Sequence, residues 1–567
     1  GYMALAGEYN GGTAPDSYMS QTFMRKYANQ VTAPYNGQAV YTFSAFENKA
    51  KNQLSPSGLT ANSEPSGHKT LSYGAAFIHR REKWIVSLKT NSRYQFVRQS
   101  NDPWITYFAN GMLEINGSTW IRYGSPKLQT DFGVNGYDWR KMPGTTSVNF
   151  ADITKIICKE SYYFRTANTF VGGVMQDGNG VFTMQIPSYP NNSSGLASFS
   201  GNKSYFCFDN TIVCLGSNIS NNVVSDSTIT TLFQDAVSTP DSTYIDNKGF
   251  TTSPYNAANY LYSPSWLMNS HKVGYWIPVE QNLRFSRISQ NNKNWTNTAT
   301  VTGTFATAWL NHGIGPKNVT YSYFMKLNTS RTEMANFDAQ MQGSAPTFTV
   351  LALTDKLHAV ESVNNNSYAA AAVINAGSNI NLKDVISVSK PCVFMMKTLN
   401  STQKKLSVAY PDLDFIDNGL YSDQTWWSYS NTNTVQIKLK DNWSLANPVS
   451  PNVSMISKLN NVTTIQYLLK DGLTTDALIT LDTTTIDTIQ KASDPKIIVS
   501  PNEISISLPV DGWSNTTGQI LSLDGKTKQR FVLGKSVTSV SIINFVHGAY
   551  LIHLKSDSQT FTRKVII

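Results

Sequence analysis

After residue 68 the chain follows the hydrophobic pattern of β-strands. Short segments rich in aromatic and β-branched residues alternate with Gly, Asn, Asp and Pro, which is typical of strands joined by tight turns. The clearest of these segments are 71–80, 83–90, 107–115, 181–186, 205–219 and 320–327. Asn-Gly and Asp-Gly pairs stand at 110–111, 116–117, 177–178 and 179–180, and such pairs favour hairpin turns. Because no helices alternate with the strands, the pattern predicts a mainly β protein with a large antiparallel sandwich over residues 51–365.

Two further β domains and a helical segment complete the expected organisation of the 567 residues. Strand patterns at 391–399, 404–411 and 434–440 predict a second, smaller β domain over residues 366–488. The last part, residues 489–567, has its own strands and predicts a separate small β-sandwich. Residues 1–50 instead carry a helix pattern that Asp16 or Ser17 can cap and that ends before Pro34. One or two helices cannot form a core, so this segment is interpreted as the tail of a helical domain.

Composition narrows the class of partner. Aromatic residues make up 12% of the chain and charged residues only 15%, the profile of a secreted β-rich protein. The 46 basic and 37 acidic residues give a net charge of +9, which favours a polyanionic partner or merely a slightly basic surface. No Lys/Arg-rich run or nucleic-acid motif is present, so an acidic polysaccharide fits better than a nucleic acid. No apolar run approaches the length of a membrane span.

The cysteines and histidines give no sign of a cofactor. Cys158, Cys207, Cys214 and Cys392 form no CxxC pair, and no His stands at zinc-ligand spacing from them. Cys207 and Cys214 flank a predicted turn, so they either meet as a disulfide or remain buried free thiols. His79 and His312 have no recognisable base partner in the sequence, and we expect structural roles for both. We therefore predict no cofactor, without excluding a structural divalent cation.

The most informative motif is GYDWRKMPGTT at 136–146, which places a Trp and two cations before a Pro-Gly turn. It resembles the WDW-x-x-x-PGTT signature of family 8 polysaccharide lyases, most closely the chondroitin ABC lyase branch. GYMALAG at 1–7, GAAFIHRREKWIVSLKTNSRY at 74–94, NGMLEI at 110–115 and KSYFCFDNTIVCLGSNI at 203–219 are similar to segments of the same family, in the same order. TTLFQ at 230–234 and TFATAWLNHGIGPKNVTYSYFM at 304–325 continue the resemblance.

The resemblance implies an incomplete α/α toroid, a central β-sandwich and a C-terminal β domain. It also implies β-elimination on a uronate-containing polysaccharide such as chondroitin sulfate or hyaluronan. In the family an Asn, His, Tyr and Arg set comes mainly from the toroid, which would precede Gly1 here. The β domain adds a Glu on a loop, and the matching position is Gln99, in a loop that is a few residues shorter. A Gln side chain donates and accepts hydrogen bonds but carries no charge and transfers no proton.

Five residues around this loop and the motif are candidates for substrate binding. Arg93 and Arg98 can hold a sulfate or carboxylate with two hydrogen bonds each, or they can serve as solvated surface charges. Asn101 and Trp104 lie in the same polar loop, which is either one wall of a saccharide cleft or a solvated hairpin. Trp104 and Trp139 can stack on a sugar ring, although a Trp in such a motif also commonly fills a core.

The last 79 residues resemble the C-terminal sorting domain of the type IX secretion pathway in Bacteroidetes. The match rests on Pro501-Asn502 at the start, a GAYLIHL strand at 548–554 and a TRKVII ending at 562–567, with Glu503 where that domain has a second Pro. The alternative is a generic terminal β-sandwich. This resemblance implies a bacterial protein that is secreted or held at the cell surface.

Two functions follow as hypotheses. In the first, the chain is the β portion of a secreted glycosaminoglycan lyase whose main catalytic residues lie upstream, so that the chain by itself is inactive. In the second, it is a non-catalytic relative that binds polysaccharide or acts as a β scaffold, which Gln99 and the shortened loop favour. A hydrolase with paired carboxylates has little support, because no two acids share a plausible cleft loop. We expect a monomer in either case.

Overall fold

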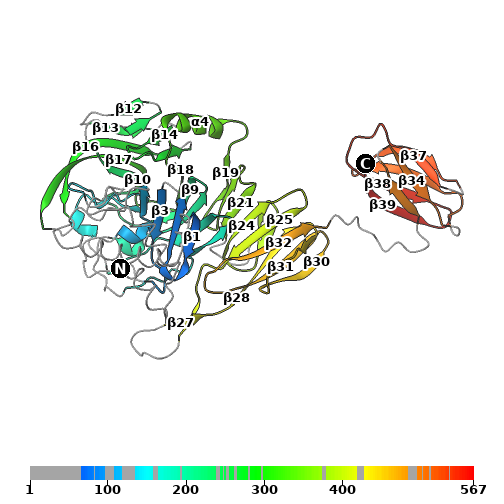
Figure 1. Ribbon diagram of the computed structural model, residues 1–567, viewed down its shortest axis with the longest axis horizontal. Coiled ribbons are helices and arrows are strands. Elements are labelled where there is room, and N and C mark those ends of the chain that lie inside the picture. The colour runs from blue at the N-terminus through cyan, green and yellow to red at the C-terminus, as the bar shows by residue number, and fades with distance from the viewer. Residues whose placement is uncertain are drawn as a thin grey trace, which may run out of the picture. The chain divides into compact units, whose positions relative to one another are not determined.

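The computed structural model describes residues 66–567 except for a set of short segments. These excluded segments are 82–83, 96–106, 118–133, 157–163, 192–194, 238–242, 247, 251–254, 261–264, 279–280, 295–297, 373–378, 418–426, 483–494, 501, 510–512 and 535–536. The chain divides into two compact units, Gly1–Asp482 and Thr483–Ile567. Both are built of antiparallel strands, and the described residues contain one α-helix, so the protein is mainly β (Figure 1). The helical segment predicted for residues 1–50 lies outside the described residues.

A nine-stranded sheet lies at the centre of the first unit, in the order β12-β11-β14-β15-β18-β9-β8-β7-β6. Its strands are β12 (Lys248–Phe250), β11 (Thr243–Ile245), β14 (Ser265–Met268), β15 (Gly274–Ile277), β18 (Val319–Lys326), β9 (Thr211–Ser220), β8 (Ser200–Phe208), β7 (Asn179–Gln185) and β6 (Gly172–Gln176). The β8–β9 hairpin is buried on both faces over nearly its whole length. Such two-sided burial explains why this hairpin lacks the alternation of a half-exposed strand.

Two smaller sheets cover one face of the nine-stranded sheet. The first has the order β1-β2-β3-β4 and consists of β1 (Gly67–Leu71), β2 (Ala76–Arg81), β3 (Trp84–Lys89) and β4 (Leu113–Gly117). The second has the order β13-β16-β17-β10-β5 and consists of β13 (Tyr255–Tyr260), β16 (Leu283–Lys293), β17 (Thr300–Ile314), β10 (Ser227–Ala236) and β5 (Thr146–Val148).

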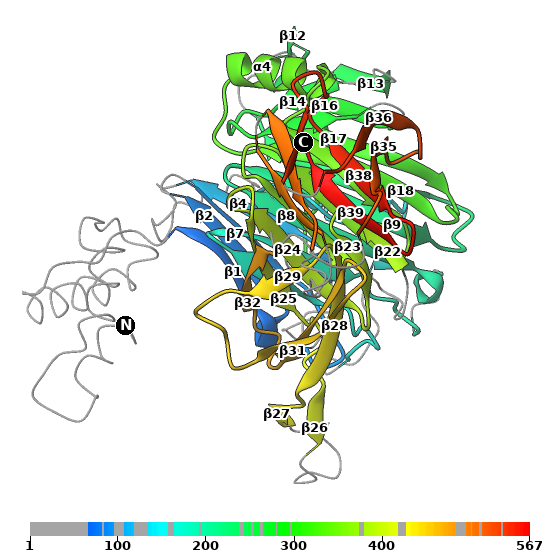
Figure 2. The same cartoon turned by 90° about the vertical axis from the view of Figure 1, so that its right-hand side faces the viewer.

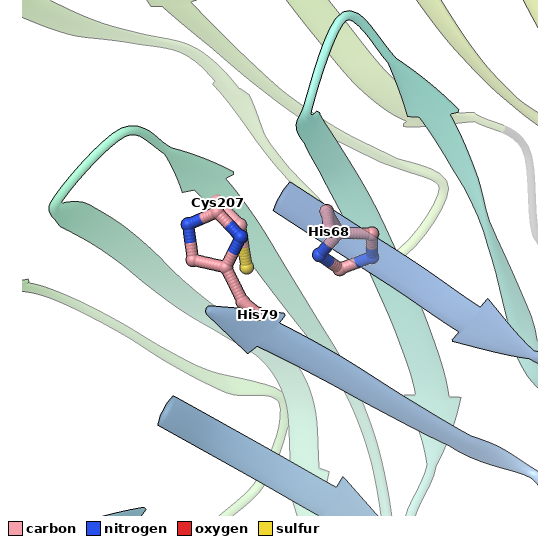
Figure 3. Close-up of side chains that lie close together, drawn as sticks. All are labelled: His68, His79 and Cys207. Atoms are coloured by element: carbon pink, nitrogen blue, oxygen red, sulfur yellow. The ribbon is translucent and has the colours of Figure 1, made fainter. Parts of the chain in front are cut away.

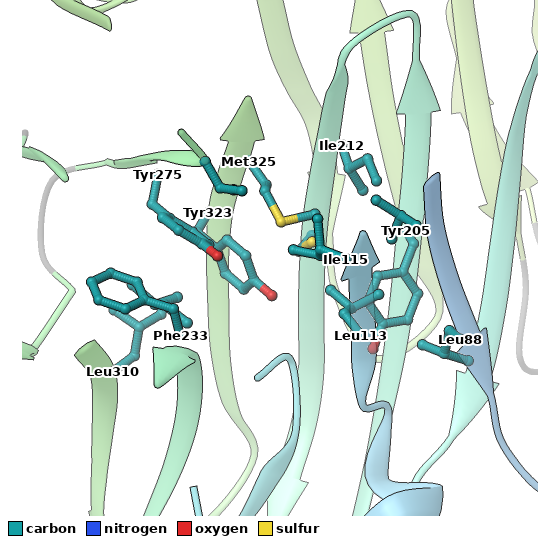
Figure 4. Close-up of a cluster of buried hydrophobic side chains, with 14 of the residues drawn as sticks. Leu88, Leu113, Ile115, Tyr205, Ile212, Phe233, Tyr275, Leu310, Tyr323 and Met325 are labelled. Atoms are coloured by element: carbon teal, nitrogen blue, oxygen red, sulfur yellow. The ribbon is translucent and has the colours of Figure 1, made fainter. Parts of the chain in front are cut away.

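The core between these layers is the largest apolar cluster of the described residues (Figure 4). Leu88 and Leu113 enter it from the first small sheet, Phe233 from the second, and Tyr205 and Tyr323 from the nine-stranded sheet. Each of these side chains is almost completely removed from water. Burial of so many large side chains supplies the main driving force for closing the sandwich.

A second sandwich covers the other face of the nine-stranded sheet. Its seven-stranded sheet has the order β19-β20-β21-β24-β25-β32-β29, with β19 (Phe348–Leu353), β20 (Leu357–Ser362), β21 (Ser367–Ala372), β24 (Cys392–Thr398), β25 (Gln403–Ala409), β32 (Thr475–Leu481) and β29 (Trp443–Leu445). Phe206 and Val213 of the central hairpin share an apolar cluster with Val393 and Met395 of this sheet. Successive residues of β8 thus belong to different cores, as the period of two in a strand requires.

The outer layer is a five-stranded sheet in the order β22-β23-β28-β31-β30. It consists of β22 (Asn379–Leu382), β23 (Val385–Val388), β28 (Asn433–Lys440), β31 (Val462–Leu469) and β30 (Val453–Leu459). A two-stranded ribbon, β26 (Phe415–Asp417) and β27 (Trp427–Ser430), extends away from the other strands of this unit (Figure 2). The helix α4 (Arg331–Gln342) lies against β14 and β15, and Ser330 and Glu333 form its N-terminal capping box.

The second unit contains a three-stranded sheet, β33-β34-β37, and a four-stranded sheet, β36-β35-β38-β39. The strands are β33 (Lys496–Val499), β34 (Glu503–Ser507), β37 (Thr538–Ser541), β36 (Thr527–Val532), β35 (Thr517–Ser522), β38 (Ala549–Lys555) and β39 (Thr560–Ile566). Apolar residues of both sheets, such as Ile504 and Ile552, form one separate core. The small terminal β-sandwich expected from the sequence is therefore a compact unit of its own.

Strand pairing differs from the expected division of the first unit at one place. The expected boundary lies between residues 365 and 366, but β19 and β20 pair in one sheet with β21. The second sandwich therefore begins at Phe348. The transition coincides with α4, which lies between β18 and β19 in the chain.

Candidate functional site

The loop that carries Gln99, Arg98, Asn101 and Trp104 lies outside the described residues, but both of its ends are described. At the upstream end, Ser92 Oγ accepts hydrogen bonds from the backbone N–H of Tyr94 at 3.2 Å and of Gln95 at 3.1 Å. These bonds form a tight turn directly after β3. The backbone N–H of Arg93 also donates to the carbonyl of Asn168 at 2.9 Å, which fixes the turn to a neighbouring segment.

The downstream end is fixed by Asn110, the last residue of the short helix η2 (Tyr107–Asn110). Its side-chain amide donates to the carbonyl of Thr146 at 3.1 Å, and its Oδ1 accepts from the hydroxyl of Tyr189 at 3.2 Å. Its carbonyl accepts from Lys203 Nζ at 3.0 Å. Asn110 is fully buried, so these bonds satisfy groups that have no access to water. The loop between residues 96 and 106 therefore starts and ends at rigid points.

The Arg93 guanidinium is paired with two carboxylates of the second sandwich. Its Nε donates to Asp412 Oδ1 at 3.1 Å, and its Nη2 lies 2.8 Å from Asp412 Oδ2 and 3.3 Å from Asp414 Oδ1. Burial lowers the pKa of Arg93, but the Asp412 carboxylate outweighs it, so the pKa is raised overall. The guanidinium thus joins the turn after β3 to the second sandwich, and its two-point binding is already used by a protein carboxylate.

Trp139 is a core residue, which corrects its assignment as a sugar-stacking platform. Only 1% of its surface is exposed, and its indole N–H donates to the carbonyl of Lys293 at 2.7 Å. The ring packs edge-on against Tyr137 with 5.1 Å between the ring centroids. With neither face open to solvent, the ring can stabilise the motif but cannot stack on a saccharide.

The charged residues of the same motif form a buried network. Asp138 is 2% exposed and accepts from Arg140 Nε at 2.6 Å, while Lys141 Nζ lies 3.3 Å from its other oxygen. Burial raises the pKa of Asp138, but the positive charges of Lys141 and Arg140 outweigh this effect and leave it lowered. The side chain of Gln234 donates to the carbonyls of Asp138 and Lys141 at 3.0 and 2.9 Å. The motif is thereby fixed against β10.

The Pro-Gly turn of the motif encloses a buried lysine that sequence reasoning missed. Gly144 has a φ of 80°, and a Cβ there would lie 2.8 Å from the carbonyl oxygen of Gly111. The carbonyl of Gly144 accepts from Lys203 Nζ. Burial lowers the pKa of Lys203 to about 7. The signal in the sequence is one cation on the same side of the strand KSYFCF as Tyr205 and Cys207.

A chain of hydroxyl groups connects His312 to the motif. His312 Nε2 lies 2.7 Å from Thr230 Oγ1, which lies 2.8 Å from Thr146 Oγ1, which in turn donates to the hydroxyl of Tyr321 at 3.2 Å. The imidazole stacks on the Tyr321 ring with 5.4 Å between centroids. Burial lowers the pKa of His312 to about 4, so the ring is neutral at pH 7. This is the hydrogen-bonded structural histidine that we expected.

One surface cavity of about 680 Å³ opens at the N-terminal end of α4. Tyr244, Lys272, Ser330 and Arg331 contribute to its lining, and the Arg331 guanidinium lies 4.4 Å from the centroid of the Tyr244 ring. Two cations beside an aromatic ring and hydroxyl groups suit an anionic or sugar-like ligand. No pattern in the sequence indicates this cavity, because its residues come from four separate segments.

The fold and its order of domains define a class of polysaccharide lyases. Residues 66–338 match the polysaccharide lyase family 8 super-sandwich domain, and residues 349–412 match the C-terminal β-sandwich domain of the same family. Together the two matches cover more than half of the chain. The chain belongs to polysaccharide lyase family 8.

Individual relatives agree with this assignment. The chain is 28% identical to the chondroitin sulfate ABC exolyase of Proteus vulgaris over 455 residues, which cover 72% of this chain and 42% of that enzyme. It is 24% identical to the chondroitin sulfate ABC exolyase of Bacteroides thetaiotaomicron over 505 residues, covering 83% of this chain and 47% of that enzyme. The chain thus spans about half the length of the curated relatives that it matches.

Solved structures share the fold. The chondroitin AC lyase of Streptomyces coelicolor A3, in complex with chondroitin sulphate, aligns with a TM-score of 0.63 at 18% identity over 85% of this chain and 58% of that one. A Paenibacillus xanthan lyase aligns with a TM-score of 0.65 at 15% identity over 100% of this chain and 57% of that one. Among the described residues no helix is long and apolar enough to cross a membrane.

Proposed function

We propose that this chain is the β portion of a glycosaminoglycan lyase that cleaves uronate-containing polysaccharide by β-elimination. The observation that carries the proposal is the presence of both β domains of family 8, in order, in a chain about half as long as its relatives. Those relatives are chondroitin sulfate lyases, so chondroitin sulfate and hyaluronan are the first substrates to test. The net charge of +9 suits such polyanions.

The proposed reaction removes the C5 proton of the uronate and expels the oxygen bonded to C4, which leaves a C4–C5 double bond. The developing negative charge on the uronate carboxylate needs hydrogen-bond donors or cations, and the leaving oxygen needs a proton. In our proposal a preceding helical domain supplies the base and the acid. The loop 96–106 of this chain forms one wall of the cleft, where Arg98, Asn101 and Trp104 contact the polymer.

A specific observation favours a second candidate, a polysaccharide-binding relative without catalysis. Gln99 stands where the family resemblance places a Glu, and an amide cannot transfer a proton at neutral pH. The position would still be able to hydrogen-bond to a saccharide, since an amide both donates and accepts. The two candidates therefore predict the same binding but different turnover.

One experiment separates them. The purified chain is incubated with chondroitin sulfate, hyaluronan and, as an uncharged control, dextran, and both binding and the ultraviolet absorbance of unsaturated uronate are recorded. The same assay is repeated with the chain joined to the helical domain of the Proteus vulgaris exolyase. Binding without product in the first case and product in the second supports the lyase. Binding without product in both supports the non-catalytic relative, and no binding in either assay contradicts both proposals.

We also propose that the protein is secreted or held at the cell surface of a bacterium, with residues 489–567 as its sorting domain. The support is the resemblance of this segment to type IX sorting domains and its separate core. Fusing residues 489–567 to a reporter in a bacterium with that pathway tests the idea. The reporter should reach the medium or cell surface, and retention equal to that of the unfused reporter would contradict the proposal.

A further inference from the structure

Three metal-ligating side chains meet in the interior beneath the first small sheet. His68 on β1 and His79 on β2 are directly opposite each other, and Cys207 comes from the end of β8 in the nine-stranded sheet. One donor atom of each residue lies within 4.8 Å of the other two. Figure 3 shows the Cys207 sulfur beside the two imidazole rings. None of the three residues has more than 6% of its surface exposed.

The hydrogen bonds of His79 fix which of its nitrogens has a lone pair. Its Nε2 lies 2.8 Å from the carbonyl oxygen of Asp209, and a carbonyl only accepts, so Nε2 carries the hydrogen. Nδ1 of His79 therefore has a free lone pair, and it has no hydrogen-bond partner among the described residues. A ring N–H donated to a backbone carbonyl is the usual support of a metal-binding histidine.

His68 also has one ring nitrogen near an oxygen atom and one without a partner. Its Nε2 lies 3.4 Å from Thr70 Oγ1, whereas its Nδ1 is buried and also lacks a partner in the described part of the chain. Buried polar atoms are nearly always satisfied, so two such nitrogens beside one thiol require an explanation.

The backbone leaves room for this cluster. Gly180 on β7 pairs with Cys207 on β8, and a Cβ at Gly180 would overlap the ring of His68. The imidazole therefore occupies space that any other residue at position 180 would fill. A glycine inside a strand weakens it, so its presence here is consistent with a need to seat the ring against the sheet.

We propose that His68, His79 and Cys207 bind a thiophilic d¹⁰ metal ion, Cu(I) or Zn(II), at a structural site. Two imidazoles and one thiolate form a soft donor set that suits both ions and excludes calcium and magnesium. Metal–nitrogen and metal–sulfur bonds of about 2.0 and 2.3 Å place ligand atoms roughly 3.5–4 Å apart, so the donors must approach by about 1 Å at most. The thiol proton leaves to solvent when the ion binds.

The charges around the cluster favour the monovalent ion. Arg81 is held beside it by Asn179 Oδ1 at 3.0 Å and by Asp209 Oδ1 at 3.5 Å. Cu(I) with one thiolate leaves the site neutral, whereas Zn(II) with one thiolate leaves it with a net positive charge near a guanidinium.

Such an ion would fasten the first small sheet to the central sheet. β1 and β2 carry the histidines, and β3, which pairs with β2, leads into the turn before the loop 96–106. The ion would therefore stabilise the scaffold of the candidate cleft without contacting a substrate. The proposal does not depend on the function proposed above, because it concerns metal content and stability.

The test uses the whole chain under reducing conditions. One sample is produced, and a second is refolded, in the presence of Zn²⁺ alone or of Cu⁺ alone. Metal per chain is measured by mass spectrometry after unbound ions are removed, and Tm is recorded with and without metal. We expect about one ion per chain and a raised Tm. Retention of Cu⁺ but not Zn²⁺ would identify the monovalent ion, and the reverse would identify zinc.

Three variants make the result specific. Cys207→Ala removes the thiolate, and His79→Gln keeps an N–H for the Asp209 carbonyl but removes the imidazole ligand. Cys214→Ala is the matched control, because Cys214 lies in the same hairpin and the same core but outside the cluster. The first two variants should lose at least tenfold in affinity and the metal-dependent rise in Tm, while the control keeps both.

The proposal is wrong if the wild-type chain holds no more metal than Cys207→Ala under either condition. Equal metal content in all four proteins would likewise show that ions bind elsewhere. A variant that fails to fold is replaced by Cys207→Ser, whose hydroxyl preserves the volume but is a poor ligand for either ion. Retention of the metal by Cys207→Ser would also overturn the assignment.

Discussion

His358 Nδ1 lies 2.8 Å from Ser204 Oγ on β8, and its Nε2 lies 2.8 Å from Ser217 Oγ on β9. His358 belongs to β20 of the second sandwich, so one imidazole connects the two sandwiches through both of its nitrogens. It is 1% exposed, and burial lowers its pKa from 6.5 to about 3. The contact between the sandwiches therefore depends on a neutral ring.

Acid should weaken this contact. The folded-state pKa of His358 is depressed, so the unfolded chain takes up the proton first as pH falls below 6.5, and stability is lost from there down to about pH 3. At pH 5 we expect a loss of about 2 kcal/mol from this group relative to pH 8. Urea unfolding followed by tryptophan fluorescence at both pH values measures it. His358→Gln should lose less stability on acidification than wild type, and His547→Gln, at an exposed position, should lose as much.

Lys203 should make stability depend on pH in the alkaline range. Burial depresses its pKa to about 7, so the unfolded chain alone holds this proton between pH 7 and about 10.5, and stability rises with pH across that window. Between pH 6 and pH 9 the expected gain from this group is about 2–3 kcal/mol. Unfolding of wild type and Lys203→Met at these two pH values tests it. The variant should lack the gain, and an equal gain in both proteins would contradict the depressed pKa.

The sequence predicted local structure well because the relevant signals are local. The β8–β9 hairpin follows from apolar strands on both sides of Asp209-Asn210, and Asp209 takes the positive φ of 49° that such a turn needs. Cys207 and Cys214 lie on these strands as free, buried thiols, one of the two alternatives that the sequence left open. The strand pattern and the turn residues are sufficient to predict a hairpin and the residues that lie on its strands.

The contacts between sandwiches could not be predicted in the same way. His358 and Ser204 are 154 residues apart, and Arg93 and Asp412 are 319 apart. Each residue looks like an ordinary surface group in its own segment, and only the stacking of the sheets brings the partners together. The ion pair of Arg93 could not be predicted for this reason, since its carboxylate partner gives no signal near it in the chain.

Arg93 should therefore affect stability rather than ligand binding. Arg93→Ala leaves Asp412, whose side chain is 11% exposed, without its bidentate partner, and we expect a loss of about 1–2 kcal/mol after solvent screening. A double-mutant cycle with Asp412→Asn should give a coupling energy of at least about 0.5 kcal/mol. Affinity for chondroitin sulfate should stay near wild type in Arg93→Ala and fall in Arg98→Ala. Equal losses of affinity in the two variants would show that Arg93 does contribute to polysaccharide binding.

Substitution of Trp139 should affect stability, whereas substitution of Trp104 should affect polysaccharide binding. Trp139 is enclosed by Tyr137 and Phe305, so Trp139→Ala should cost about 3–5 kcal/mol of stability or prevent folding. Trp139→Phe keeps most of the ring volume but loses the hydrogen bond to the Lys293 carbonyl, and a cost of about 1–3 kcal/mol is expected with unchanged polysaccharide affinity. Trp104→Phe and Trp104→Ala should weaken binding with little change in Tm. A Trp139→Phe protein that folds normally but binds weakly would contradict the core assignment.

Gln99 offers the sharpest test of whether the loop takes part in chemistry. In the chain joined to a helical lyase domain, Gln99→Glu introduces a carboxylate of nearly the same shape, which can accept and return a proton where the amide cannot. If the position acts in the reaction, formation of unsaturated uronate should rise by about 10²–10⁴-fold, the usual contribution of a positioned acid or base. Gln99→Ala serves as the control for shape and should not exceed wild type. Equal rates in Gln99→Glu and wild type, with product formed by both, would show that the loop shapes the cleft but transfers no proton.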